Sequence, residues 1–455
     1  YYTRVDEKDA LFLLPGGLTE SNARSTLLSN ATYDFAGGAV GRPWYNPDKN
    51  NFAPNVGLAY DVFGNGKTAL RAGYSINFVN DENIVAIRNS VTTNSGLTTT
   101  VTASGLNSRL SSPTAVRVPT FRVPRTAADN FALDSQNAQA AVDPALRTPY
   151  VQQYSLGIQQ NIKETILEIR YIGNHAVKQF RAFDANQVNI NVPGFMDDFR
   201  RAYNNGMLAQ AAGRGFDPAF SAAVPGSQAT PFFNGLPSGG LLSNATIRSL
   251  IQTQQPGELA TTYQVNGLNG NTNFFASPYG LGMNLFANYS HSSYNGLQVD
   301  ARRRLRNGVQ LQANYTYGKV LSDTSGDSQT RFDPFLDANN GKIERARAIF
   351  DTTHIIRANG VYQLPMGKGH AWNPSNPVLN RLVSGWNVGA IMTKQSGTPF
   401  SVVSGRGTFN RAARSGATNT ANTTLNKSQL DNLIGFRMTG NGPYIIDLGA
   451  IGSDG

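Results

Sequence analysis

Hydrophobic and polar residues alternate with a two-residue period over several stretches of this sequence, the pattern of β-strands with two different faces. In residues 68–78 the even positions are mostly apolar and the odd positions are polar or small. Residues 56–62 alternate in the same way, and the glycine-rich segment Phe63–Lys67 separates the two stretches. The pattern predicts two antiparallel strands joined by a tight turn.

This turn contains Gly66-Lys67-Thr68, the last three letters of a phosphate-binding loop. Such a loop needs a glycine five residues before Gly66, where this sequence has Asp61. It also needs a helix after Thr68, where the alternation predicts a strand. The sequence therefore favours a hairpin turn over a nucleotide site.

Three further strand pairs show the same alternation, so about eight strands are predicted. The second pair returns through the turn Lys163–Thr165, and the third through Arg306-Asn307-Gly308, whose Asn-Gly step is a strong hairpin signal. The fourth pair has the longer connection Pro365–Gly385, where a short helix is expected near Val378–Leu382. The predicted pairs lie near 53–79, 150–175, 294–320 and 353–396.

The connections between the pairs are long and rich in Gly, Pro, Ser, Thr and Asn; they lie near 80–148, 177–292, 321–350 and 397–455. Two segments of the second loop have helical spacing. One is "MDDFRRAYNNGM", with Met196, Phe199, Tyr203 and Met207 on one face, and the other is "SNATIRSLIQTQ", with Ser243 as the expected N-cap. We expect both helices to pack locally within the loop.

Short turns at one end and long loops at the other are typical of a transmembrane β-barrel, and a soluble sandwich has loops of comparable size at both ends. The polar faces of the strands carry amides and charges, which a watery lumen accommodates better than a dry core. We therefore predict an all-β, antiparallel transmembrane β-barrel with short periplasmic turns and long extracellular loops carrying some short helices. The candidate lumen-facing residues are Arg71, Asn77, Glu168, Arg170, Asp300, Arg302, Gln310, Gln312, Asn314, Arg357 and Asn359.

The opposite face of each strand is apolar and is predicted to contact lipid. Its members include Leu70, Tyr74, Leu167, Ile169, Val299, Leu311, Tyr315 and Ile356. Aromatic residues lie near the strand ends, where a membrane-interface girdle belongs. These are Tyr60, Phe78, Tyr150, Tyr171, Tyr317, Tyr362 and Trp386.

The composition agrees with a large β protein, because the 455 residues include 46 Gly, 24 Phe and 18 Tyr and only 15% are charged. The absence of cysteine excludes a disulfide framework and a Cys-based metal site. The net charge of +10 is compatible with nucleic acid or an anionic membrane surface as a partner. The one dense basic run, Arg302-Arg303-Arg304 with Arg306, fits either a solvated turn or a phosphate-contacting patch.

Several segments between residues 51 and 403 together carry a family resemblance. They are "NFAPNVGLAYDVFGNGKTALRAGYSINF", "TPYVQQYSLGIQQNIKETILEIRYIGNHAVKQF", "YNGLQVDARRRLRNGVQLQANYTYGKVLSD", "FDTTHIIRANGVYQLPMGKG" and "SGWNVGAIMTKQSGTPFSV". These motifs resemble those of TonB-dependent outer-membrane receptors, in particular the subgroup with an N-terminal carboxypeptidase-regulatory-like module that is abundant in Acidobacteria.

The resemblance implies a 22-stranded barrel in the bacterial outer membrane, plugged by a globular domain, that imports scarce ligands with energy from TonB. This chain shows no recognisable TonB box, plug, N-terminal module or closing aromatic strand, so we expect residues 1–455 to be part of the barrel domain of a longer protein. The implied partners are outer-membrane lipid and lipopolysaccharide, TonB through the missing plug, and an unknown ligand. No nucleic acid partner is expected.

No enzyme motif such as HExxH, CxxC or GxSxG is present, and we expect neither catalysis nor a cofactor. The four histidines are far apart in sequence; they are His175, His291, His354 and His370. One loop carries four aspartates whose spacing differs from that of a calcium loop. They are Asp323, Asp327, Asp333 and Asp337.

Ligand import is the function we predict, and a structural or adhesive role of the long loops is the alternative. A soluble nucleic-acid binder is a third hypothesis, which rests only on the net charge of +10 and on the run Arg302–Arg306. The loops combine amides with aromatic residues, which suits an oligosaccharide or a peptide, unless the aromatic residues only pack the loops together. These residues are Phe121, Phe131, Phe199, Tyr203, Phe232, Phe233, Tyr263, Phe274 and Phe275.

Overall fold

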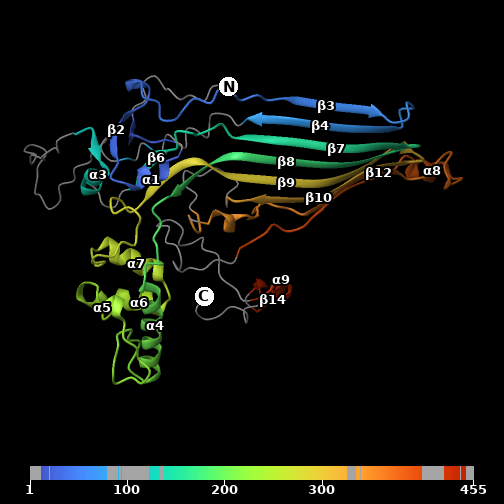
Figure 1. Cartoon of the computed structure of the whole chain (residues 1–455). Helices are drawn as coiled ribbons and strands as arrows, with labels where there is room; N and C mark the ends of the chain where they lie inside the picture. Colours follow the sequence, from blue (N-terminus) through green and yellow to red (C-terminus); the bar gives the residue numbers. More distant parts are fainter. Residues whose placement is uncertain are drawn as a thin grey trace, which may run out of the picture.

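The computed structural model consists of a long sheet, a lobe of short strands and helices at one end of it, and a helical insert that projects from the same end (Figure 1). It describes residues 12–19, 21–78, 91, 94, 122–133, 138–324, 335–338, 340–401, 425–440 and 442–446. Among these residues, no helix is both long enough and apolar enough to cross a membrane.

The long sheet contains a meander of eight antiparallel strands, each paired with the next along the chain. These strands are β3 (Asn55–Asp61), β4 (Thr68–Phe78), β7 (Tyr150–Ile162), β8 (Thr165–Asp184), β9 (Met283–Arg306), β10 (Val309–Ser322), β12 (His354–Gln363) and β13 (Asn387–Gln395). The hairpin turns and helix α8 (Pro377–Val383) lie at the right-hand end in Figure 1, and the long connections lie at the left-hand end. The predicted hairpins and the short helix are thus present.

The hairpin turns follow from residues that tolerate left-handed backbone conformations. Asn307 and Gly308 have φ values of 53° and 78°, as a two-residue type I′ turn requires. In the first turn the Gly66 N–H donates to Asp61 Oδ2 at 2.7 Å, and Thr68 begins strand β4. A strand and not a helix follows Thr68, so the segment is a turn and lacks the geometry of a phosphate-binding loop. The predicted turn Lys163–Thr165 is one residue too long, because β8 begins at Thr165.

Strands β8 and β9 extend further than the sequence predicts. Strand β8 runs eight residues, and β9 ten residues, into the segment 177–292 that was expected to be a loop. Their register shifts twice between Ala176 and Arg181, and beyond this irregularity the last four residues of β8 and the first five of β9 are buried. The alternating pattern disappears there because both faces of the strands are covered.

A lobe of short elements covers these buried strand ends. Its small sheet has the order β1 (Phe12–Pro15), β2 (Thr32–Ala36) and β5 (Arg125–Thr126), while β6 (Gln139–Val142) pairs in parallel with β9. The core of the lobe includes Phe12, Trp44, Val142 and Phe286. Helices α1 (Ala23–Leu28) and α3 (Ala127–Leu133) complete the lobe. Apart from the helical insert, the other described elements are η1 (Gly38–Val40), η3 (Gly341–Glu344), β11 (Ala346–Arg347), α9 (Lys427–Leu433), β14 (Ile434–Thr439) and β15 (Gly442–Ile446).

The helical insert lies between β8 and β9 and has its own hydrophobic core. It contains α4 (Phe195–Ala211), α5 (Pro231–Asn234), η2 (Pro237–Leu241), α6 (Ala245–Gln252) and α7 (Pro256–Val265). The N-cap of α6 is Asn244, whose side chain accepts from the N–H groups of Thr246 and Ile247, so the expected cap at Ser243 was wrong by one residue. Burial raises the pKa of Tyr263 well above its ordinary value, and its neutral hydroxyl donates to the Gly240 carbonyl at 2.7 Å.

A neck of three hydrogen bonds closes the base of the insert. Asn186, which is fully buried just after β8, donates through Nδ2 to the carbonyls of Ser277 and Gly280 and accepts from the Ser277 N–H at 2.7 Å. The segment 277–280 leads back into β9, so one side chain joins the two chain segments that enter and leave the insert.

The long sheet is open. Strands β3 and β13 are its two edges, and no strand among the described residues pairs with their outer sides. The expected 22 strands and the closure of the barrel therefore remain predictions.

Replacing Phe195 by alanine should lower the local unfolding free energy of the insert by about 3–5 kcal/mol, because this fully buried ring contacts the rings of Phe232, Phe233 and Phe274. Hydrogen exchange of α6 and α7 amides, measured by mass spectrometry, should accelerate by about a hundredfold or more. The control Met207→Ala removes a half-exposed side chain from the same helix and should change exchange little. Equal acceleration in β10 and β12 would show that the insert is not a separate unit.

Candidate functional site

The polar face of the long sheet is the candidate functional site. The strand register places all eleven predicted residues on this one face. Glu168, Asp300, Asn314 and Arg357 lie side by side on four neighbouring strands, and Arg302, Gln312 and Asn359 form an adjacent row. Four further candidates lie outside these two rows, on the same face: Arg71, Asn77, Arg170 and Gln310.

Four charges on β8 and β9 form a compact group on this face. Glu168 and Asp300 are direct cross-strand neighbours, so their like charges repel one another. Each carboxylate has an arginine on its own strand: Arg170 lies 3.8 Å from Glu168, and Arg302 Nε lies 2.6 Å from Asp300 Oδ1. Arg170 also donates to Gln298 Oε1 at 3.0 Å. The face is therefore charged but locally balanced.

A hollow of about 340 Å³ lies beside this group, within the range of about 300–1,000 Å³ that is common for ligand sites. The polar residues that line it come from β9, β10, β12 and β13. They are Asp300, Gln312, Asn314, Arg357, Asn359 and Thr393. Amide, hydroxyl, guanidinium and carboxylate groups together suit a ligand with many hydrogen-bonding groups.

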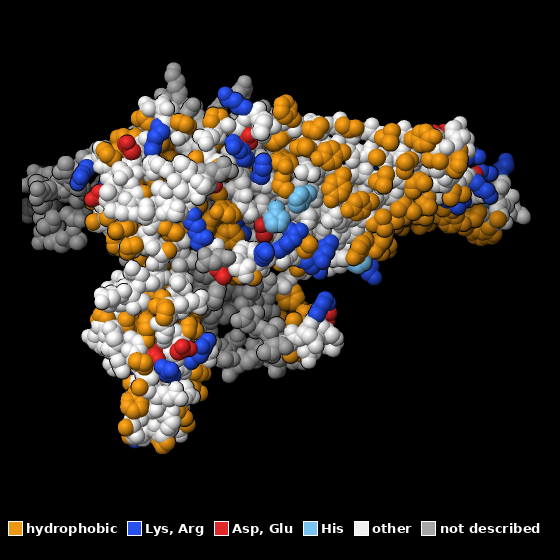
Figure 2. Space-filling model, viewed as in Figure 1, with side chains coloured by type: hydrophobic (Ala, Val, Ile, Leu, Met, Phe, Trp, Pro, Cys, Tyr) orange, Lys and Arg blue, Asp and Glu red, His pale blue; other side chains and the backbone are white. Residues whose placement is uncertain are grey.

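The opposite face of the sheet is apolar and exposed, and Figure 2 shows hydrophobic side chains spread over the strands to the right-hand end. Val56 is 62% exposed, Leu58 58% and Tyr317 48%, and the exposed residues continue across all eight strands. An apolar surface that spans a whole sheet is an interaction surface. Its chemistry is that of a surface in contact with hydrocarbon.

Aromatic residues lie towards the loop end of this apolar face. The hydroxyls of Tyr154 and Tyr171 both donate to Asn295 Oδ1, at 3.2 and 2.6 Å. The ring of Tyr154 covers Gly173 so closely that a Cβ at this glycine would lie 2.3 Å from the ring. Rings with a polar tip directed at an amide belong at a membrane–water interface.

Most of the candidate aromatic residues of the insert are not available for ligand stacking. Phe199, Phe233, Tyr263, Phe274 and Phe275 are buried in its core. The alternative interpretation, that they pack the loop, is thus correct for these residues. Phe131, Tyr203 and Phe232 are partly exposed, and Phe121 lies outside the described residues.

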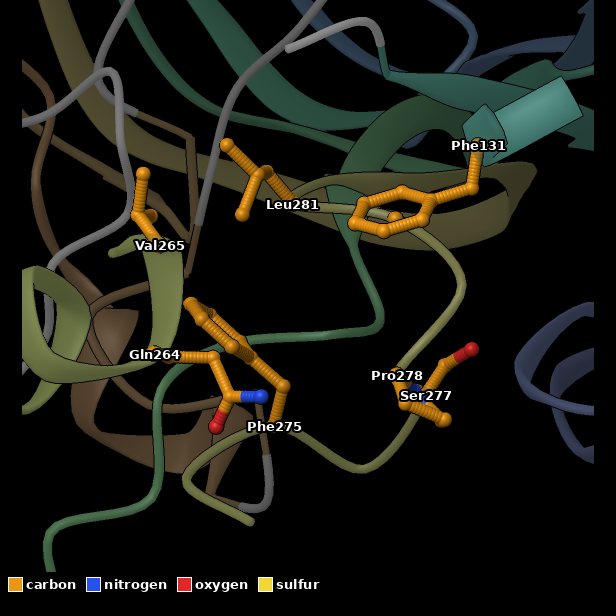
Figure 3. A pocket seen from close by; sticks show the side chains of 8 residues that line it. Phe131, Gln264, Val265, Phe275, Ser277, Pro278 and Leu281 are labelled. Carbon is orange, nitrogen blue, oxygen red and sulfur yellow. The ribbon is translucent and has the colours of Figure 1, made fainter. Parts of the chain in front are cut away.

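One small hollow of about 50 Å³ lies at the joint between the insert and the lobe (Figure 3). Phe131 of α3, Gln264 at the end of α7 and Leu281 before β9 are among its lining residues. A space of this size holds a few water molecules at most. It is too small for an imported ligand.

Two histidines and an aspartate meet where the sheet enters the lobe. The rings of His175 and His291 are 6.5 Å apart, and His291 Nδ1 lies 3.0 Å from Asp323 Oδ2. Among the described residues, no group of three or more His, Cys, Asp or Glu side chains is arranged to hold a metal ion. Of the other aspartates in this loop, Asp327 and Asp333 lie outside the described residues. The sequence separation of these groups concealed their proximity.

Residues 13–441 match the family described as outer membrane beta barrel domain. The match covers most of the chain, and the chain belongs to this family. Its location is therefore the bacterial outer membrane. The open sheet with one apolar and one polar face is a segment of such a barrel wall.

Solved structures of outer-membrane proteins show a distant likeness. The transporter YddB from Escherichia coli has 10% identity, with 80% of this chain and 35% of that chain covered and a TM-score of 0.31. The ferripyoverdine receptor of Pseudomonas aeruginosa, bound to ferripyoverdine, has 12% identity, coverage of 82% and 26%, and a TM-score of 0.30. The siderophore receptor PirA from Acinetobacter baumannii has 10% identity, coverage of 73% and 28%, and a TM-score of 0.26.

The chain spans about a third or less of the length of these structures. Scores of this size carry no argument about its ligand or partners. A comparison with curated proteins finds no match to this sequence.

Replacing Arg302 by glutamine should lower the free energy of unfolding by about 0.5–1 kcal/mol, because two adjacent carboxylates then share one arginine. Adding Glu168→Gln should recover this loss. Urea unfolding in lipid vesicles measures both effects, and they should shrink at about 1 M salt, where the Debye length is about 3 Å.

The matched control is Arg304→Gln, which removes a charge from the same strand, two residues from Arg302, where no ion pair is formed with a described residue. Its effect should be smaller than that of Arg302→Gln. Equal losses in the two variants would contradict the pairing of Arg302 with Asp300.

Proposed function

We propose that this chain forms part of the barrel wall of a TonB-dependent outer-membrane receptor that imports a scarce ligand. The observation that carries the proposal is a single sheet with an exposed apolar face and a charged, amide-rich face. Such a wall separates hydrocarbon from a watery passage. The hairpin motifs, which resemble the subgroup with a carboxypeptidase-regulatory-like module, support the same class.

The role of TonB follows from this class. A barrel of about 22 strands is wide enough to need a plug, and a plugged barrel needs energy to open. In this proposal the plug, the TonB contact and the strands that pair with β3 and β13 lie outside the described residues. The eight strands of the meander and their connections contribute wall and loops only.

The ligand we propose is an oligosaccharide or a peptide. The support comes from the hollow beside Arg357, because its amides, hydroxyl, guanidinium and carboxylate match the many donors and acceptors of sugars and peptide bonds. The aromatic residues that first favoured this class give less support, since most of those that are described are buried.

Single cysteines test which face meets water, and the natural chain has no cysteine to interfere. In the intact protein in membranes, a water-soluble maleimide should modify cysteines at polar-face positions such as Arg71, Arg170 and Gln312. Positions on the other face, such as Leu70 and Ile169, should stay unlabelled. The reverse pattern would mean that the barrel faces are inverted.

A cysteine at Asn307 tests sidedness. This turn lies at the short-turn end of the sheet, so it should be labelled in broken cells and protected in intact cells. Labelling of intact cells would place the short turns outside.

Binding of a panel of glycans, peptides and ferric chelates to the intact receptor tests the ligand class. The double variant Asn314→Ala/Asn359→Ala should weaken binding of its glycan or peptide by about tenfold or more, because the hydrogen bonds of the hollow are lost. Gln310→Ala, on the same face but outside the hollow, is the matched control. Tight binding confined to ferric chelates would contradict the ligand proposal.

Uptake by a deletion strain tests import itself. We expect a strain that lacks the receptor to lose uptake of the ligand. Normal uptake combined with lost surface adhesion would instead favour the structural or adhesive alternative.

A further inference from the structure

A second hollow lies on the polar face of the long sheet, nearer to the loop end than the hollow beside Arg357. This outer hollow has a volume of about 340 Å³. Part of its lining forms one row across the five neighbouring strands β3, β4, β7, β8 and β9 (Figure 1), because consecutive members of the row are direct cross-strand partners. The members of this row are Asn55, Ser75, Gln153, Asn174 and Tyr294.

The floor of the outer hollow is formed by the adjacent row of the sheet. Gly73 pairs with Ser155, and Ser155 pairs with Ile172. All three residues line the hollow. A Cβ at Gly73 would lie 3.2 Å from Ser155 Oγ, so a larger side chain at either position would fill part of the space.

Tyr294 bounds the outer hollow with an aromatic ring that lies along the sheet. Gly296 on β9 and Gly318 on β10 are cross-strand partners, and a Cβ at either glycine would overlap the Tyr294 ring. The ring therefore occupies the space above these two glycines. Its side chain is half-buried, so one side of the ring is covered by the sheet and the other is accessible from the polar face.

The polar groups of the outer hollow are uncharged and have no protein partners. Within the described part of the chain, the side-chain amides of Asn55, Gln153 and Asn174 form no hydrogen bond, and neither does the Tyr294 hydroxyl. The hollow beside Arg357 differs, because a guanidinium and a carboxylate line it. Amides and a hydroxyl can both donate to and accept from a neutral ligand.

We propose that the outer hollow binds a sugar ring of a neutral oligosaccharide. The apolar C–H face of the sugar would pack on the Tyr294 ring, and its hydroxyls would form hydrogen bonds with the Gln153 and Asn174 amides. This inference rests on the proposed import function and narrows its ligand class to a glycan.

A peptide fits the outer hollow less well than a sugar. Strands β4, β7, β8 and β9 are paired on both sides, so they offer no free backbone edge to an extended chain. A charged ligand also fits less well, because no lining residue carries a charge.

The two hollows lie at different depths along the polar face. Tyr294 of the outer hollow and Asp300 of the other hollow are six residues apart on β9, which corresponds to about 20 Å. The outer hollow is nearer to the long loops, so a ligand that enters from the loop end reaches it first.

The test measures binding of neutral hexaoses to the intact purified receptor in detergent by isothermal titration calorimetry, with maltohexaose, cellohexaose and xylohexaose as probes. The natural protein should bind at least one of them. Y294A should bind that hexaose about tenfold more weakly because the stacking face is lost, whereas Y294F should retain most of the affinity. S155W fills the floor and should weaken binding at least as much as Y294A.

The matched control Y317A removes a half-exposed ring from the opposite face of β10 and should leave binding unchanged. Retention of the folded form during electrophoresis without heating shows that each variant is folded. A cysteine at Asn174 gives a second readout, since a saturating concentration of the hexaose should slow its labelling by a water-soluble maleimide. A cysteine at Gln310, outside both hollows, should be labelled at the same rate with and without the sugar.

Four results would overturn the proposal. They are binding of peptides but of none of the hexaoses, unchanged binding by Y294A, equal losses in Y294A and Y317A, and labelling at Asn174 that the hexaose does not slow. Weaker binding by Asn314→Ala/Asn359→Ala combined with unchanged binding by Y294A would remove the outer hollow and leave the import function standing. Normal uptake by the deletion strain would instead count against the import function itself.

Discussion

Hydrogen bonding of the backbone within hydrocarbon is the constraint on which this structure depends. An unpaired N–H or C=O group in a bilayer costs several kcal/mol, so strands that cross it must be paired on both sides. The eight-stranded meander meets this requirement everywhere except at β3 and β13, its two edges. The same constraint is met by short turns at one end of the sheet, because each strand then pairs directly with the strand before it. It is relaxed only beyond the irregularity near Ala176, where strands, helices and irregular segments are combined freely in the lobe and the insert.

The strands of the long sheet could be predicted from the sequence because the two faces of the sheet have different surroundings. Lipid on one side and water on the other impose strict alternation, and Asn307-Gly308 fixes a hairpin with little ambiguity. Helices α4 and α6 could be predicted for a similar reason, since each buries one face in the core of the insert. Where both faces are buried, as at Arg181–Asp184, the alternation vanishes, and the sequence no longer shows that β8 continues. Strands of two to five residues, such as β5 and β2, are too short to show any period.

The residues of the candidate site could be assigned to a face, but their neighbours could not be identified. Parity within a single strand is enough to group Glu168 with Arg170, or Asp300 with Arg302. That Glu168 lies beside Asp300 depends on the register of β8 against β9, which the chain sets only after the whole insert has been passed. Aromatic residues in the insert were ambiguous for another reason: composition does not distinguish a ring that packs a core from one that stacks on a ligand.

The neck at Asn186 allows the helical insert to be exchanged for another domain without changing the sheet. Asp184 and Asn284 are paired neighbours, so the chain leaves the sheet and re-enters it at adjacent positions. The entropic cost of closing such a connection grows only with the logarithm of its length. The stability of the paired strands therefore depends little on the length of the connection between them. One buried amide seals the junction with bonds to the backbone, which do not depend on the side chains beyond it. The position is therefore a natural graft point, where another folded domain with closely spaced termini can replace the insert while the strands of the sheet keep their register.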